Sequence, residues 1–93
     1  MFGTMADVKE ANRAIGHHWF EPSSMRFFRS RVGQTLYGGR YFISSEQFDD
    51  QSPRLYTVRE VKPDGSIGTV GQFQGHRSRD HALTVIKDLL SVD

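Results

Sequence analysis

Two strand-like runs joined by a tight turn and followed by an amphipathic helix occupy the last forty residues of this 93-residue chain. The runs cover residues 54–62 and 66–73, and residues 63–65 between them read Pro-Asp-Gly. Proline presets φ, aspartate hydrogen-bonds its own backbone and glycine accepts a positive φ, so this turn predicts a β-hairpin. Residues 79–91 then have helical apolar spacing, with Ser78 as the N-cap. This half of the chain predicts a small α+β core.

The first half of the chain predicts two helices and one strand. Apolar residues recur at helical spacing over 5–15, where Thr4 is placed to cap the helix and Gly16 to stop it. Residues 25–32 predict a shorter helix that ends at the following glycine, and residues 41–48 read as a strand.

The predicted fold is α+β: one domain, residues 1–93, in which a three-stranded antiparallel sheet carries the C-terminal helix and N-terminal helical segments. The run 54–62 alternates poorly between polar and apolar residues, although a sheet with one wet face should alternate sharply. We therefore expect the C-terminal helix on one face and part of the N-terminal aromatic segment on the other. The side chains expected to be largely buried are Trp19, Phe28, Tyr41, Tyr56, Phe73, Val85, Ile86 and Leu89.

Composition excludes several classes of protein. The chain has no cysteine, which removes disulfides, thiolate zinc sites and thiol nucleophiles. A net charge of +1 gives no global attraction to nucleic acid or to an anionic membrane. No run approaches the ~18–20 apolar residues that a membrane span needs, and the N-terminus lacks the layout of a secretory signal.

The histidines do not form a recognisable metal or catalytic motif. His17 and His18 are adjacent, so their side chains diverge, and His76 and His81 are too far apart for a helical ligand pair. Ser78 with His81 has the residue types of a nucleophile and a base, but the capping role accounts for Ser78. We expect no metal site.

Two further patterns also have simpler explanations than catalysis or phosphate binding. The glycines within residues 65–71 lie in the predicted hairpin, whereas a phosphate loop joins a strand to a helix. Glu46, Asp49 and Asp50 are the only candidates for paired catalytic carboxylates, and the alternative is a solvated loop cluster. The sequence therefore predicts neither an enzyme nor a cofactor.

Residues 26–40 are the strongest candidate for a binding segment, because they carry four arginines and no acidic residue, interleaved with aromatics. Nucleic-acid binding uses arginines on phosphates and aromatics on bases. The alternative is that the two phenylalanines belong to the core and the arginines form a solvated face. The candidate binding residues in this segment and beyond it are Arg26, Arg29, Arg31, Tyr37, Arg40, Phe48, Arg54 and Arg59.

Four stretches, WFEPSSMRFFRSRV, YGGRYFISSEQF, RLYTVREV and DGSIGTVGQFQ, cover most of the chain. In these the sequence resembles an uncharacterised family of short proteins encoded by actinobacterial phages and related mobile elements. The resemblance implies a phage accessory protein acting in the cytoplasm of the host cell. It assigns no catalytic or binding residue.

The last half of the chain is also similar to the AP2 and integrase-arm DNA-binding domains. The residues that carry this similarity are Gly71, Phe73, Ser78 and Ala82. It implies a sheet that enters the major groove through strand residues, here Arg54, Arg59 and Lys62.

Two functions follow as expectations. The first is a small non-enzymatic phage accessory protein that binds a host or phage protein, in host takeover or counter-defence. The second is a nucleic-acid-binding module that uses either the arginine-bearing sheet or residues 26–40. A small chain rich in aromatics also favours a homodimer.

Overall fold

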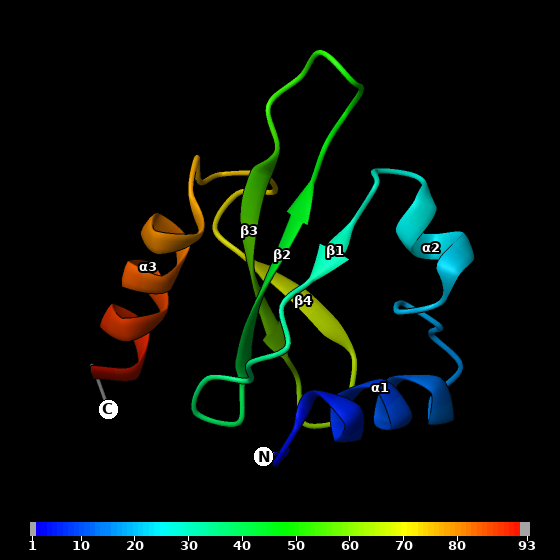
Figure 1. Ribbon diagram of the computed structural model, residues 1–93. Coiled ribbons are helices and arrows are strands. Elements are labelled where there is room, and N and C mark those ends of the chain that lie inside the picture. Colours follow the sequence, from blue (N-terminus) through cyan, green and yellow to red (C-terminus); the bar gives the residue numbers. More distant parts are fainter. Residues whose placement is uncertain (1, 92–93) are drawn as a thin grey trace.

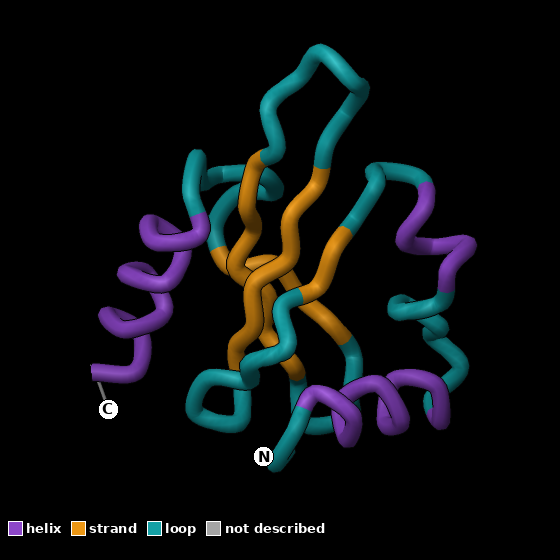
Figure 2. Tube along the Cα trace, in the orientation of Figure 1, coloured by secondary structure: helices purple, strands orange, loops and turns teal. Residues whose placement is uncertain are grey.

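A computed structural model describes residues 2–91 and confirms an α+β fold with an antiparallel sheet and a C-terminal helix. Its four strands follow chain order across the sheet, β1-β2-β3-β4, and every neighbouring pair is antiparallel. Figures 1 and 2 show helices on both sides of this central sheet. The elements are α1 (Met5–Ala14), α2 (Pro22–Arg26), β1 (Arg31–Val32), β2 (Tyr41–Glu46), β3 (Leu55–Val61), β4 (Ile67–Val70) and α3 (Arg79–Ser91).

The prediction of three strands is wrong, because the short edge strand β1 lies where the sequence predicted a helix. Helix α2 ends early in a Schellman motif: the N–H of Ser30 donates to the carbonyl of Met25 at 2.7 Å, and that of Arg29 to Arg26 at 3.2 Å. Arg29 takes the left-handed conformation of this motif, with φ of 49°. The chain leaves the turn extended, and β1 pairs with β2.

Strand β4 ends at Val70, three residues before its predicted end, and this overturns the predicted burial of Phe73. Gly71 and Gln74 both adopt positive φ, 76° and 57°, so the backbone turns out of the sheet between them. Phe73 therefore lies on a loop with 42% of its surface exposed. Of the other predicted core residues, Tyr41 and Ile86 are buried; Trp19, Phe28, Tyr56, Val85 and Leu89 are half-buried.

The sheet is covered on both faces, as the weak alternation of β3 predicted. On one face, α3 packs its buried side chains against β2 and β3. That cluster is Tyr41, Ile43, Val58, Ala82 and Ile86. On the other face, α1 and the aromatic segment that follows it cover the sheet. That cluster is Met5, Val8, Phe42 and Val61, with Trp19 and Phe20 packed against it.

The predicted hairpin turn also holds α1 in place. Asp64 accepts a hydrogen bond from the N–H of Ser66 at 2.9 Å, and Gly65 has a φ of 96°, as the turn chemistry predicted. The buried side chain of Asn12 donates to the carbonyl of Gly65 at 3.0 Å and accepts from the N–H of Trp19 at 2.8 Å. One amide thus ties α1 to the hairpin and to the aromatic segment.

We predict that Gly65→Ala destabilises the fold more than Gly71→Ala. Both glycines have positive φ, which costs a non-glycine residue about 1–2 kcal/mol. A Cβ at Gly65 also lies 2.9 Å from the carbonyl carbon of Ala11, whereas no described residue lies within 4 Å of one at Gly71. Displacing α1 should add about 1–3 kcal/mol. Urea denaturation of the two variants measures the difference, and equal losses would contradict this packing.

Candidate functional site

A concave surface lies between α2, β1 and the loop that joins β2 to β3, and arginines dominate its lining. Its volume is about 570 Å³. We call it the arginine groove, and its lining residues are Pro22, Met25, Arg26, Arg29, Ser30, Arg31, Gln47 and Arg54. Four of the eight predicted binding residues therefore meet on one surface, although Arg54 is far from the other three in sequence.

Backbone contacts fix the walls of the arginine groove. The N–H of Gln47 donates to the carbonyl of Phe28 at 2.9 Å, which joins the start of the β2–β3 loop to the segment after α2. Pairing of Arg31 with Ser45 holds β1 against β2. Arg54 reaches back across the sheet edge, and its Nη1 donates to the carbonyl and hydroxyl oxygens of Ser45 at 3.1 and 3.0 Å.

The groove concentrates positive charge. Burial lowers the pKa of Arg54 below its usual value, and the neighbouring charge of Arg31 lowers it further. These two guanidinium groups are therefore close enough to repel each other. Among residues 2–91, no carboxylate forms an ion pair with Arg26 or Arg31. The groove holds uncompensated charge that an anionic ligand would neutralise.

Arg29 is the one groove arginine with an acidic partner in the described chain. Its Nη1 donates to a carboxylate oxygen of Asp50, on the β2–β3 loop. The neighbouring Asp49 shapes that loop, because its Oδ1 accepts from the hydroxyl of Ser52 and from the N–H groups of Gln51 and Ser52. These hydrogen bonds lower the pKa of Asp49, and the bond from the Ser52 hydroxyl has the largest effect.

Exposed phenylalanines lie close to the arginine groove in the chain. Phe27, which follows Arg26, is 79% exposed, and Phe48, on the β2–β3 loop, is 73% exposed. The sequence singled out Phe48, and it left Phe27 open between an aromatic of the binding segment and a core residue. Sequence position alone does not separate Phe27 from Phe28, because residues 25–32 predict a continuous helix whereas α2 ends at Arg26.

Two of the predicted binding residues lie away from the groove, in and at the end of the loop between β1 and β2. The hydroxyl of Tyr37 accepts a hydrogen bond from Arg79 at 3.0 Å. Arg40 pairs with Glu60 at 2.6 Å and stacks over the ring of Tyr41. Both side chains serve internal contacts, and the structure does not join them to the other candidates.

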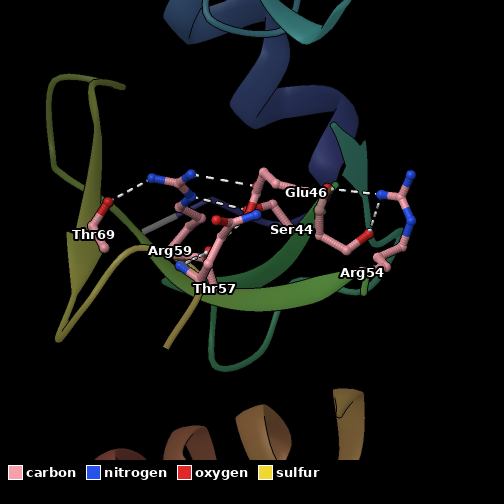
Figure 3. A network of polar contacts seen from close by, with 8 residues as sticks. Ser44, Glu46, Arg54, Thr57, Arg59 and Thr69 are labelled. Carbon is pink, nitrogen blue, oxygen red and sulfur yellow. Dashed lines mark hydrogen bonds and ion pairs between the residues drawn. The ribbon is translucent and has the colours of Figure 1, made fainter. Parts of the chain in front are cut away.

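Arg59 lies inside the protein, at the centre of a polar network on the α1 side of the sheet (Figure 3). Its Nε donates to the hydroxyl of Ser44 at 3.0 Å, its Nη1 to that of Thr69, and its Nη2 lies 3.5 Å from a carboxylate oxygen of Glu46. Thr57 donates to the other oxygen of Glu46 at 2.7 Å. The network joins β2, β3 and β4.

Aromatic rings pack beside the guanidinium of Arg59. The guanidinium of Arg59 lies 5.1 Å from the ring centroid of Trp19 and 5.3 Å from that of Phe73. Burial lowers the pKa of Arg59, and Glu46 opposes this shift. Arg59 is thus engaged by internal partners rather than projecting from an open sheet face.

The position of Glu46 differs from the solvated loop cluster with Asp49 and Asp50 that the sequence suggested. Glu46 is the last residue of β2 and only 1% exposed. The three carboxylates therefore do not form a pair for acid–base chemistry at one site.

The histidine and serine candidates at the start of α3 make contacts within the fold. Ser78 caps α3, accepting from the N–H of His81 at 3.0 Å, as predicted. His76 and His81 bring their Nδ1 atoms within 3.3 Å, and burial, then the charge of His81, lowers the pKa of His76. Within residues 2–91, no three histidine, cysteine or acidic side chains come together as a metal site. No helix in that range has the length and apolarity to cross a membrane.

The fold and the site define a small α+β protein with an arginine-lined groove and a buried polar network. The chain belongs to DUF7447, a family of unknown function, whose match covers residues 4–87. This confirms the expected membership of an uncharacterised family. No curated protein and no solved structure matches the chain.

We predict that Glu46→Ala costs far more stability than Glu60→Ala. Removing Glu46 leaves the buried charge of Arg59 unpaired, which typically costs about 3–5 kcal/mol. Glu60 pairs with the half-exposed Arg40, and such a pair contributes about 0–1 kcal/mol. Chemical denaturation compares the two variants. Similar losses would show that Arg59 does not depend on Glu46.

Proposed function

We propose that this protein is a small non-enzymatic binding protein that engages a protein partner through the arginine groove and the exposed Phe27. The observation that supports this most directly is that four arginines line one concave surface of about 570 Å³. Arginine and aromatic side chains are the residue types that contribute most of the free energy at protein interfaces.

The distribution of charge favours a protein partner over nucleic acid. The net charge is +1, so the chain has little overall positive field, and Asp50 pairs with Arg29 of the groove. A nucleic-acid backbone carries charge along its whole length and gains affinity from many phosphate contacts. A protein partner can place acidic groups over the arginines and neutral groups over the aspartates.

Nucleic-acid binding is the second candidate, and one observation favours it: Arg26 and Arg31 have no acidic partner in the described chain, and the exposed Phe27 lies between them in sequence. That mode uses residues 26–40 and not the sheet, because Arg59 is buried. We expect such binding to be no tighter than the ~10⁻⁴–10⁻⁶ M of non-specific association.

The resemblance to proteins of actinobacterial phages extends the proposal to a biological role. Under it, the protein is a phage accessory protein in the cytoplasm of the host cell, and its partner is a host or phage protein in takeover or counter-defence. A homodimer also stays a proposal, because three phenylalanines, Phe27, Phe48 and Phe73, are exposed; light scattering tests it.

We predict that groove variants lose partner proteins during affinity purification from the host cell. The variants are Arg26→Gln/Arg31→Gln and Phe27→Ala, and the matched control is Arg77→Gln, an exposed arginine outside the groove lining. Truncating an interface anchor typically costs about 2 kcal/mol or more, which is at least ten-fold in affinity.

Nuclease treatment separates the two proposed functions. Proteins that the wild type and Arg77→Gln retain after nuclease, and that the groove variants release, would support protein binding. Recovery of nucleic acid with the wild type, together with loss of all captured proteins after nuclease, would replace it by the second candidate.

A further inference from the structure

The contact of Arg29 with Asp50 is an observed pairing of a groove guanidinium with a carboxylate. Asp50 is 89% exposed on the β2–β3 loop, so charge rather than burial holds the pair. A carboxylate carried on a peptide loop therefore already reaches one guanidinium of the groove. Carboxylate and guanidinium have matching geometry and form charge-assisted hydrogen bonds.

The loop presents Asp50 in a defined way. Asp49 accepts from the N–H groups of Gln51 and Ser52 at 2.9 and 2.8 Å, and the side chain of Gln47 donates to the carbonyl of Ser52 at 3.1 Å. The loop is thus closed on itself by bonds that do not involve Asp50. The carboxylate of Asp50 can leave Arg29 without breaking any of them.

Arg29 occupies a strained backbone position, which fits a role beyond folding. It is the left-handed residue of the Schellman motif after α2, where glycine is usual. An arginine at such a position strains the backbone, and backbone strain of this kind is often found at binding sites. Glycine in its place would retain the turn and remove the charge.

We infer that the arginine groove binds an acidic peptide segment of the partner, and that Asp50 is an internal competitor that the partner's carboxylate displaces from Arg29. This inference rests on the proposed function and names the chemistry of its partner. Arg26 and Arg31 have no ion-pair partner among residues 2–91 and supply the first attraction. Arg29 binds the partner's carboxylate once Asp50 has left its guanidinium.

The test measures the affinity of a fluorescent hexaglutamate peptide for the full chain by anisotropy at low salt. We expect Asp50→Asn to bind about two- to five-fold more tightly than the wild type, because an exposed ion pair no longer has to be broken. The control is Asp88→Asn, which makes the same change in net charge on α3 and leaves the groove untouched. Its affinity should stay close to that of the wild type.

A double-mutant cycle assigns the effect to Arg29. Arg29→Gly should weaken peptide binding, and Asp50→Asn in that background should no longer tighten it, because the competed guanidinium is absent. Tightening of equal size in both backgrounds would overturn the role of Asp50 at Arg29. So would equal affinities for Asp50→Asn and Asp88→Asn.

The outcomes also separate this inference from the proposed function. If Arg26→Gln/Arg31→Gln abolishes peptide binding while Asp50→Asn changes nothing, the competitor role fails and the groove stands. If neither the wild type nor Asp50→Asn binds hexaglutamate, both ideas fail for acidic partners. Tighter binding of a single-stranded DNA oligonucleotide than of the peptide in the same buffer would overturn the assignment to an acidic protein.

Discussion

The rest of this structure depends on the contacts that the buried guanidinium of Arg59 makes with neighbouring strands. It contacts Ser44 and Glu46 on β2 and Thr69 on β4, so one side chain joins the strands on both sides of its own. A buried charge of this kind is stable only when its partners surround it. The same contacts make that face of the sheet polar, and a polar face needs a cover that tolerates a cation. Trp19 supplies one, since its ring lies over the guanidinium.

The aromatic cover in turn determines where the arginine groove lies. Trp19 and Phe20 both pack on this face of the sheet, and the helix that follows them, α2, is short and has no buried residue. The Schellman motif at Arg29 then returns the chain to the sheet edge as β1. The arginines of this excursion therefore face the loop between β2 and β3 rather than the core. The candidate site is a consequence of how one face of the sheet is covered.

Local signals in the sequence were sufficient for the parts of the fold that local contacts decide. Thr4 caps α1 and Gly16 follows its end in the left-handed conformation, and α3 covers the predicted residues 79–91. The sequence does not reveal strand β1, because a left-handed arginine is rare and Gly33 is the residue that fits a helix stop. Phe73 was misplaced because two positive-φ residues, only one of them glycine, turn the chain out of β4. In each case the backbone conformation depends on what the segment packs against.

The candidate site was predictable as a set of residues but not as a surface. Arg26, Arg29 and Arg31 are close in sequence, and their density without acidic neighbours was the usable signal. Arg54 joins them only through the pairing of β2 with β3, which sets its distance from Ser45. Arg59 carries the same charge but lies within β3, on the face that α1 and Trp19 cover, whereas Arg54 precedes that strand. Two arginines five residues apart thus have different surroundings: Arg59 holds neighbouring strands together, and Arg54 lines the groove that we propose as a binding surface.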